Sequence, residues 1–565
     1  MKFIPTVTLA LALYSAAHAA DPAPIAFDSF TYIGRDDAFN TSITKDYYLN
    51  PILAGYYPDP SICRVGDDYY LINSSFAHFP GIPIHHSRDL VNWTQLGHVI
   101  DRPTQLKYYG LGISRGIFAP AISHHNGVFY IVCTMVDAGG NFLVTATNPA
   151  GPWSDPVWFN FEGIDPSLFF ADDGRAWMVN NGGPVGAPLY QGHRAIWIQQ
   201  FDIAAKKLIG PRQVIVNGGV DISQKPVWIE GPHLYQRDGW YYLSCAEGGT
   251  GDNHSQVILR SKAPTGPFVP WDKNPILTQR DLDGTVPQAV TTTGHADLVI
   301  GPDGNWWSVF LACRPFAGNF YATGRETFLL PVKWTADGWP QILPPGERVP
   351  YVVKAPGRAN PPDEPSPEAA RQRRLALPIP LSGNFTWTDE FDSAALSPLW
   401  LMLRTPKETW WNLTDGQLRL TPRAALLSGK DNPSFFGRRL QHAKFEASAR
   451  LQVPTAVGTS AGLVAFQNET HHYYFAVRRT TGGLSAVVEK WNGSQAETLI
   501  TALLPETKVI ELRLTGDDKI LSFAYALKPG EWHIVVPAAD ATVITTQAAG
   551  GFVGALVGVH ARLEP

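Results

Sequence analysis

The sequence predicts an all-β protein, with a five-bladed β-propeller over residues 20–350 and a β-sandwich over residues 384–565. One observation behind this prediction is a turn followed by an aromatic, alternating strand, which recurs five times. The other is the C-terminal part, where short alternating segments recur without helix periodicity. The five turn glycines are Gly66, Gly127, Gly174, Gly239 and Gly304. Their spacing of 47 to 65 residues suits a four-stranded blade with loop insertions.

A short motif lies seven to nine residues before each turn glycine. The first residues of the five motifs are Asp59, Ala119, Asp165, Glu230 and His295. The distance is about one strand length, so each motif is expected to begin the innermost strand of its blade. Equivalent ends of the innermost strands surround one end of the central channel. We therefore expect the four polar side chains of this set to converge there.

Two changes in composition divide the rest of the chain. Residues 351–383 are rich in Pro, Arg and Glu and have little apolar periodicity, as expected of a linker. From residue 384 onward, alternating segments such as residues 445–451 and 472–477 predict the strands of a β-sandwich.

The first 19 residues have the layout of a signal peptide. Lys2 precedes an apolar run over residues 7–13, and small residues follow up to Ala17-His18-Ala19. This pattern predicts cleavage after residue 19 and export to the periplasm or the exterior. No later stretch reaches about 18 uninterrupted apolar residues, so no membrane-spanning segment is expected.

The composition disfavours several classes of partner. Lys and Arg total 45 and Asp and Glu total 50, a net charge of -5, so there is no basic field to attract nucleic acid. Hydrophobic residues at 44% and charged residues at 17% permit a buried core and argue against general disorder. The aromatic content of 12% fits packing within strands and also fits stacking on sugar rings.

The chain has four cysteines, which are Cys63, Cys133, Cys245 and Cys313. In an exported chain they could form two disulfides in three pairings. Each one lies in or beside a separate apolar strand-like run, which favours buried, small apolar side chains instead. Their spacing is not that of zinc ligands, so no zinc site is expected.

The carboxylates expected at the channel mouth suggest a chemistry. Three of them around one narrow opening would repel each other, so at least one pKa should rise. An ionised Asp could then activate water while a protonated Glu donates to a leaving oxygen, which is the division of roles in glycoside hydrolysis. One such motif alone would indicate only a turn at a strand start, whereas three at one ring favour catalysis.

The motifs around these residues resemble the signature blocks of glycoside hydrolase family 43. The resemblance rests on Tyr57-Pro58-Asp59-Pro60-Ser61-Ile62, Gly163-Ile164-Asp165-Pro166-Ser167 and Glu230-Gly231-Pro232-His233-Leu234-Tyr235. These blocks occur in the family's order, and residues 246–250 and 294–297 extend the match. Residues 388–392 with Leu399-Trp400 are similar to the concanavalin A-like domain of the family's β-xylosidase branch.

This resemblance implies a role for each carboxylate. Asp59 would be the general base that activates water, Glu230 the general acid, and Asp165 would orient Glu230 and raise its pKa. The reaction would be an inverting single displacement, which needs the two carboxyl groups roughly 6.5–9.5 Å apart. No cofactor would be required for the chemistry. His295 would lie near the channel axis, in contact with water or a structural calcium ion, or would be a buried, hydrogen-bonded histidine.

The resemblance also implies a blind pocket for one terminal sugar, with the sandwich shaping its rim. Its substrate-binding residues would be Phe76, Phe118, Thr250, His295 and Arg314. Phe118 and Ile164 stand where β-xylosidases of the family often have bulkier residues, and residues 225–230 and 324–328 are more similar to the α-L-arabinofuranosidases. We therefore expect an exo-acting enzyme that releases terminal α-L-arabinofuranose from hemicellulose or its oligosaccharides. A β-D-xylosidase or a bifunctional enzyme is the alternative.

Two functions from other classes compete with this one. A propeller and a lectin-like sandwich could hold glycans without cleaving them, although binding alone does not require three carboxylates. A metal-dependent hydrolase could use the acidic ring and His295 and would lose activity with a chelator, but no dense ligand motif supports it. The sequence does not indicate an oligomeric state.

Overall fold

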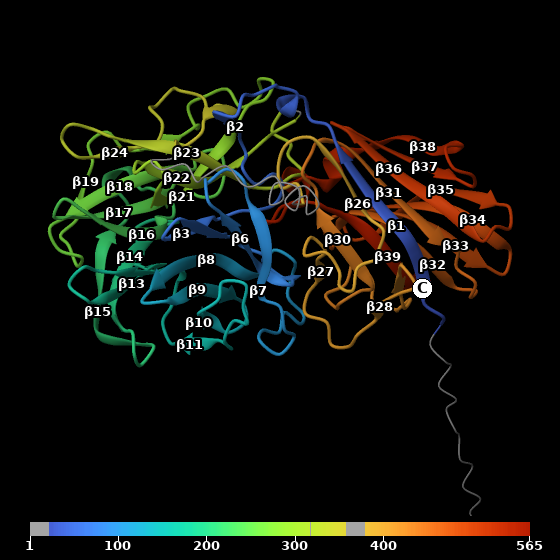
Figure 1. Ribbon diagram of the computed structural model, residues 1–565, viewed down its shortest axis with the longest axis horizontal. Helices are drawn as coiled ribbons and strands as arrows, with labels where there is room; N and C mark the ends of the chain where they lie inside the picture. The colour runs from blue at the N-terminus through green and yellow to red at the C-terminus, as the bar shows by residue number, and fades with distance from the viewer. Residues whose placement is uncertain (1–21, 317, 358–378, 565) are drawn as a thin grey trace, which may run out of the picture.

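The computed structural model describes residues 22–316, 318–357 and 379–564. Regular structure in these ranges is almost entirely β-strand, in two bodies that lie side by side (Figure 1). The predicted all-β fold class, a five-bladed propeller and a sandwich, is confirmed. The predicted signal peptide and most of the predicted linker lie outside the described residues.

Within the described ranges, five antiparallel sheets form the blades of the propeller. Four of these sheets have four strands, and the fourth along the chain has a fifth strand, β20, beside β18. Each predicted turn glycine joins the first two strands of a blade and has a φ between 62° and 83°. The blade strands are β3 (Ser61–Val65), β4 (Asp68–Ile72), β6 (Gly81–Ser87), β7 (Thr94–Ile100); β8 (Gly116–His125), β9 (Val128–Val136), β10 (Gly140–Ala146), β11 (Val157–Phe159); β12 (Ile164–Phe170), β13 (Ala176–Gly182), β14 (Ala195–Asp202), β15 (Lys207–Asn217); β16 (Glu230–Arg237), β17 (Trp240–Glu247), β18 (Ser255–Ser261), β19 (Val269–Pro270), β20 (Leu277–Thr278); β21 (Thr291–Ile300), β22 (Trp306–Cys313), β23 (Glu326–Trp334) and β24 (Pro340–Gln341).

Apolar side chains that alternate along the strands hold neighbouring blades together. Trp177 and Val179 of β13, for example, pack in one cluster with Leu243 and Cys245 of β17. All four cysteines of the chain are buried free thiols. The interpretation of the cysteines as small apolar core residues is therefore confirmed.

In the part of the chain that the structure describes, two antiparallel sheets form the sandwich. One has the order β28-β29-β1-β31-β36-β37-β38 with β26 beside β1, and the other has the order β30-β39-β32-β33-β34-β35. Residues 445, 447, 449 and 451 of β31 are buried while the residues between them are more exposed, which is the pattern of a strand with one face on the core. The strands are β1 (Ile25–Gly34), β26 (Phe385–Asp389), β28 (Trp411–Thr414), β29 (Gln417–Leu420), β30 (Phe435–Arg439), β31 (Lys444–Gln452), β32 (Thr459–Asn468), β33 (His471–Thr480), β34 (Gly483–Asn492), β35 (Ala496–Leu504), β36 (Val509–Asp517), β37 (Ile520–Ala526), β38 (Trp532–Asp540) and β39 (Leu556–Leu563).

Strand β1 belongs to the sandwich, although it lies near the start of the chain. It pairs with β26, β29 and β31, and it is the blue strand among the orange ones in Figure 1. Its buried residues Phe27, Phe30 and Tyr32 join the hydrophobic core. The predicted start of the propeller at residue 20 is therefore wrong, because this alternating segment completes a sheet whose other strands lie at the far end of the sequence.

The remaining elements are short. Strand β2 (Tyr47–Leu49) pairs with β25 (Val352–Lys354), so the propeller region closes slightly beyond its predicted end at residue 350. The helical elements in the described ranges are η1 (Asp37–Phe39), η2 (Ile222–Gln224), η3 (Ala541–Ile544) and α2 (Thr546–Ala549). In the part of the chain that the structure describes, no helix is long and apolar enough to cross a membrane.

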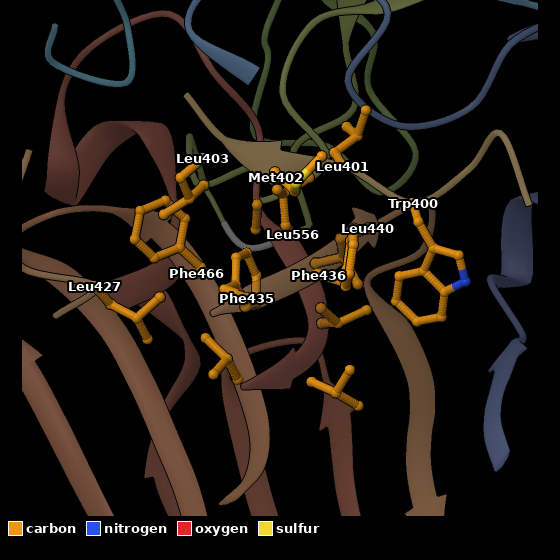
Figure 2. Packing of buried hydrophobic residues seen from close by; sticks show 14 of the residues in the cluster. Trp400, Leu401, Met402, Leu403, Leu427, Phe435, Phe436, Leu440, Phe466 and Leu556 are labelled. Carbon is orange, nitrogen blue, oxygen red and sulfur yellow. The ribbon is translucent and has the colours of Figure 1, made fainter. Parts of the chain in front are cut away.

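The propeller and the sandwich share one hydrophobic core. Strand β27 (Met402–Leu403) leaves the sandwich side and pairs with β5 (His78–Phe79) of the propeller. Figure 2 shows the side chains around this crossing, where Leu401 and Met402 lie above Phe435 of β30. Because this contact is continuous and apolar, the sandwich packs directly against the propeller and is not connected to it by a linker alone.

Candidate active site

A cavity of about 670 Å³ at one end of the propeller collects most of the predicted site residues. The predicted residues that line it are Asp59, Phe76, Phe118, Asp165, Glu230, Thr250 and His295. The three carboxyl residues are nearly buried, with at most 9% of each exposed. The predicted convergence of the four polar residues from different blades is therefore confirmed.

An unusual backbone conformation recurs where the innermost strands start. The equivalent residues of the five blades have φ between 33° and 56°, and they are Asp59, Ala119, Asp165, Gly231 and His295. In four blades the strand register shifts at this point, as in a β-bulge. Bulges redirect side chains, and positive φ is rare outside glycine. These five residues also line a second cavity of about 10 Å³, which is too small for a sugar and lies where the five blades meet.

Glu230 lies one residue before this ring. Gly231 takes the ring position, so Glu230 is equivalent to Phe118 and Ile164, which line the wider cavity. A Cβ atom on Gly231 would come within 2.9 Å of the His295 ring, so glycine is required beside this imidazole. Glu230 was predicted to be equivalent to Asp59 and Asp165, and this prediction is wrong because the next residue occupies that position. The shift directs the glutamate into the larger cavity.

Asp59 is held as an ionised carboxylate. Its Oδ1 accepts a hydrogen bond from Arg325 Nη1 at 2.7 Å, and its Oδ2 accepts one from Ser74 Oγ at 2.6 Å. Ser74 Oγ in turn accepts the backbone N–H of Ala119 at 2.7 Å, which fixes the direction of the hydroxyl. Burial by itself raises the pKa of Asp59, but Arg325, His295 and Ser74 outweigh burial and hold this pKa below its usual value.

Asp165 and Glu230 are in the opposite situation. Burial raises the pKa of Glu230 well above its usual value, and the negative charges of Asp165 and Asp59 raise it further. Burial and the charge of Asp59 likewise raise the pKa of Asp165 to about 7. Asp165 Oδ2 accepts the backbone N–H of Gly231 at 3.0 Å, which ties this carboxyl to the residue after Glu230. These shifts agree with the rise predicted for three converging carboxylates.

Two buried histidines adjoin Asp59. His295 Nδ1 is 3.9 Å from Asp59 Oδ1, and His254 Nδ1 donates to the carbonyl oxygen of Thr292 at 3.1 Å. Burial lowers the pKa of each imidazole to about 4. Both histidines are therefore neutral at neutral pH, which leaves Arg325 as the cation that stabilises the Asp59 charge.

The surroundings of His295 do not fit a calcium ion. Calcium takes about six to eight oxygen ligands, yet no group of three or more His, Cys, Asp or Glu side chains in the described ranges is placed to hold a metal. The nearest carboxylate, Asp59, is already bonded to Arg325 and Ser74. The expected calcium near His295 is not supported.

Three phenylalanine rings form one wall of the cavity. Phe76 meets Phe118 edge to face with ring centroids 4.9 Å apart, and Phe552 stacks on Phe76 at 6.1 Å. The guanidinium of Arg325 lies 5.8 Å from the Phe76 centroid and 5.7 Å from that of Phe552. Phe552 comes from the sandwich, between α2 and β39. The sandwich therefore contributes to the cavity itself, in agreement with the rim predicted for it.

Arg314 is not in this cavity, contrary to the prediction. Its guanidinium is paired with Glu326 at 2.6 Å and with Asp36 at 2.9 Å, and it lines a separate cavity of about 400 Å³. The arginine that faces the carboxylates is Arg325. Pairing of Ala312 with Glu326 places both arginines at the same end of β22 and β23. The sequence does not reveal which of the two turns toward the carboxylates.

Several residues of the cavity were not predicted, and these are Arg115, Val136, Arg194, Val227, Trp228, His254, Arg325 and Phe552. Trp228 and Arg325 lie inside residues 225–230 and 324–328, the two segments that resemble arabinofuranosidases. A polar or aromatic side chain in such a segment could therefore have been predicted to line the site. Phe552 had no such signal, because it reaches the cavity from the other domain.

The cavity holds one carboxyl group that favours the ionised form and another that favours the protonated form. The surroundings of Asp59 favour its ionised form, which can accept a proton, and those of Glu230 favour its protonated form, which can donate one. Pairs of titratable groups whose surroundings move their pKa values apart are the mark of acid–base catalysis. The geometry therefore fits a hydrolysis in which one group activates the attacking water and the other protonates the leaving atom.

Comparisons with known proteins agree with this chemistry. Residues 48–340 match the family described as Glycosyl hydrolases family 43, and residues 388–563 match the beta xylosidase C-terminal concanavalin A-like domain. The chain is 39% identical to a xylosidase/arabinosidase of Butyrivibrio fibrisolvens over 91% of this chain and 95% of that protein. It is 35% identical to a non-reducing end alpha-L-arabinofuranosidase of Bacteroides ovatus over 92% of each protein.

A solved structure is similar over nearly the whole chain. The crystal structure of a GH43_12 protein retrieved from capybara gut metagenome has a TM-score of 0.87 and 40% identity, covering 96% of this chain and 100% of that chain. Its similarity extends through both the propeller and the sandwich. The chain belongs to glycosyl hydrolases family 43 and is a glycoside hydrolase with a concanavalin A-like C-terminal domain.

Proposed function

We propose that this hydrolase cleaves its substrate by a single displacement that inverts the anomeric carbon. Asp59 acts as the general base, Glu230 acts as the general acid, and the charge of Asp165 favours the protonated form of Glu230. The observation that carries this proposal is the opposite displacement of the Asp59 and Glu230 pKa values in one cavity. All three groups belong to the chain, and the proposed step uses no cofactor.

The proton transfers follow from these charge states. As a water oxygen attacks the anomeric carbon, Asp59 takes one proton of that water. The bond to the glycosidic oxygen breaks in the same step, and Glu230 gives its proton to that oxygen. Asp59 then holds a proton and Glu230 has lost one, and exchange with solvent restores both groups for the next turnover.

We further propose that the enzyme removes single sugars from chain ends. Beneath the carboxylates the blades enclose a space of about 10 Å³, which leaves no path for a continuing polysaccharide. Phe76, Phe118 and Phe552 close one side of the wider cavity. A cavity closed in this way favours a terminal residue over the interior of a chain.

The sugar we propose is α-L-arabinofuranose, released from hemicellulose or its oligosaccharides. Phe118 and Ile164 both line the cavity, and each stands where related β-xylosidases often carry a bulkier side chain. The names of the relatives support arabinofuranosidase activity and also xylosidase activity. A β-D-xylosidase or a bifunctional enzyme is therefore the second candidate.

Paired substrates test this specificity. The rates of hydrolysis of 4-nitrophenyl α-L-arabinofuranoside and 4-nitrophenyl β-D-xylopyranoside should be measured side by side, and we expect the arabinofuranoside to be favoured. Faster hydrolysis of the xyloside would establish the second candidate. Chromatography of a digested arabinosylated oligosaccharide should show monosaccharide as the first product, and early release of oligosaccharides would contradict the exo-acting mode.

Export is a separate proposal that rests on the sequence. Residues 1–19 carry the charged, apolar and small-residue regions of a signal peptide. N-terminal sequencing of the protein recovered from the periplasm or culture medium should begin at Ala20. A mature protein that keeps Met1 would contradict this proposal.

A further inference from the structure

Trp228 is an exposed aromatic residue on the lining of the catalytic cavity. It is 37% exposed, and it lies two residues before Glu230. Its φ of 51° is in the left-handed region, which bulky residues rarely adopt. A strained backbone persists only where its surroundings enforce it, and such positions cluster at functional sites. The position of Trp228 therefore requires an explanation that packing of the core does not give.

Backbone contacts hold this segment in place. Trp228 N donates to the carbonyl oxygen of Gly192 at 3.0 Å, and Gly248 N donates to the carbonyl oxygen of Val227 at 2.8 Å. Two loops from neighbouring blades thus hold residues 227 and 228 on either side. The indole is consequently presented to the cavity from a fixed backbone, without the ordering cost of a flexible loop.

Arg194 lies on the ring of Trp228. Its guanidinium carbon is 4.6 Å from the ring centroid, and its Nε and Nη2 donate to Asn181 Oδ1 at 3.2 and 2.9 Å. Asn181 Nδ2 donates to the carbonyl oxygen of Ile229 at 2.6 Å, which links the arginine to the backbone between Trp228 and Glu230. The hydrogen bonds of the Arg194 side chain thus go to a neutral amide and not to a carboxylate.

The two carboxyl groups have chemically different neighbours in this cavity. Asp59 is bonded to Arg325, whose guanidinium lies over Phe76 and Phe552. Glu230 lies two residues after Trp228 in the same backbone segment, and both residues line the cavity. In an inverting displacement, water comes from the side of the base and the leaving group departs on the side of the acid.

We propose that Trp228 and Arg194 form the subsite for the leaving group, and that its occupant is the sugar ring next to the cleaved bond. This inference rests on the proposed role of Glu230 as the acid. The apolar face of that ring would lie on the indole, and the guanidinium would donate to its hydroxyl groups. The cavity volume is within the ~300–1,000 Å³ of pockets for drug-sized ligands, which leaves room beyond one pentose.

The test compares two substrates that differ only in the leaving group. One is an arabinosylated or xylosylated oligosaccharide, whose leaving group is a sugar, and the other is the methyl glycoside of the same pentose, whose leaving group is methanol. Both need protonation by the acid, so damage to Glu230 would lower both rates. Loss of the subsite should mainly lower kcat/KM for the oligosaccharide.

For Trp228→Ala we expect the ratio of kcat/KM for the oligosaccharide to that for the methyl glycoside to fall about tenfold, as expected for one lost aromatic contact. Trp228→Phe should recover part of this ratio. Arg194→Lys keeps the charge beside Glu230 but loses the planar guanidinium, so it should lower the ratio while leaving the pH optimum in place.

Trp240→Ala is the matched control, since Arg260 lies 4.5 Å from the Trp240 centroid but neither residue lines the cavity. Its substrate ratio should equal that of the native protein. Equal losses on both substrates for Trp228→Ala, or an unchanged ratio, would overturn the inference. Failure of the native protein to hydrolyse either glycoside would instead contradict the proposed function.

Discussion

Asp59 and Glu230 are both nearly buried carboxyl groups in one cavity, and burial alone would raise the pKa of each. The difference comes from their partners. Asp59 has Arg325 at 2.7 Å and the Ser74 hydroxyl at 2.6 Å, which together stabilise its charge. For Glu230, burial and the charges of Asp165 and Asp59 outweigh the more distant arginines. The contacts with Arg325 and Ser74 therefore separate the proposed base from the proposed acid.

Replacing Arg325 should shift the acidic limb of the pH profile. The proposed base, Asp59, acts only when ionised, and Arg325 lowers its pKa. In Arg325→Ala burial should therefore raise that pKa and move the acidic limb of kcat/KM to higher pH. The rate at the optimum should also fall roughly 100-fold, as expected when a general base is impaired. A profile of kcat/KM from about pH 4 to pH 9 measures both effects.

Arg314→Ala is the control for this prediction. Arg314 forms a buried ion pair with Glu326, so its loss should lower the free energy of unfolding by about 3–5 kcal/mol. The acidic limb of the pH profile should stay where it is. A shift of that limb in Arg314→Ala but not in Arg325→Ala would reverse our assignment of the two arginines.

Replacing Glu230 should cost most where the leaving group is poor. In Glu230→Ala, hydrolysis of an oligosaccharide should fall by roughly 10²–10⁴-fold, because an alcohol leaves slowly without a proton. Hydrolysis of a 4-nitrophenyl glycoside should fall far less, since nitrophenolate leaves without help. Steady-state kcat/KM on the two substrates checks this. Losses of equal size would remove Glu230 from the acid role.

The carboxylates could be predicted from the sequence because each lies in a motif at a nearly constant distance from a turn glycine. The exact position of each side chain within the site could not be predicted in this way. Glu230 and Gly231 occupy adjacent positions, and only the backbone geometry reveals that the glycine takes the ring position. Arg314 follows the end of β22 and Arg325 precedes the start of β23, so both lie at the same end of this strand pair. The choice between them depends on side-chain direction in the folded blade.

At the scale of elements, the sequence predicts local structure such as hairpins, but it does not predict which distant strands pair. The five hairpins of the propeller were predicted because each turn carries its own glycine and each strand its own alternation. Strand β1 shows the same alternation, yet its neighbours β26 and β31 lie near the other end of the chain. Nothing local tells such a strand which sheet it joins, so its assignment required the structure.

Phe30 tests whether β1 is an integral strand of the sandwich. Its ring is fully buried and lies 5.1 Å from Trp400 and 6.3 Å from Trp387. Phe30→Ala should lower the free energy of unfolding by about 3–5 kcal/mol through lost burial and a cavity. The midpoint of urea unfolding, followed by tryptophan fluorescence, measures this change.

Thr31→Ala is the matched control on the same strand. Thr31 lies on the outer face and shares a hydrogen bond of 3.0 Å with Thr388. Its replacement should change stability by less than about 0.5 kcal/mol. If the two variants were equally stable, β1 would not be part of the sandwich core.

At the scale of the whole molecule, residues of both domains line one cavity. Phe552 of the sandwich packs on Phe76 of the propeller, and its carbonyl oxygen accepts a hydrogen bond from Arg325 Nη2 at 3.4 Å. The sandwich thus contacts the arginine that keeps Asp59 ionised.

Removal of the Phe552 ring should therefore weaken catalysis from outside the propeller. For Phe552→Ala we expect kcat/KM to fall about tenfold, because the aromatic wall of the cavity loses one of its three rings. Phe391→Ala, at a buried sandwich position away from the cavity, should lower stability without changing KM. An unchanged kcat/KM for Phe552→Ala would show that the sandwich has no part in the active site.

The central claim is that Asp59 and Glu230 act together in one displacement. Proton NMR of the first product formed from an α-L-arabinofuranoside, or from a β-D-xyloside if that is the preferred substrate, tests it most directly. A single displacement predicts that the first sugar released has the anomeric configuration opposite to that of the substrate, before mutarotation mixes the two forms. Release of the anomer with the substrate's own configuration would contradict the account, since it would require a covalent intermediate and a nucleophile.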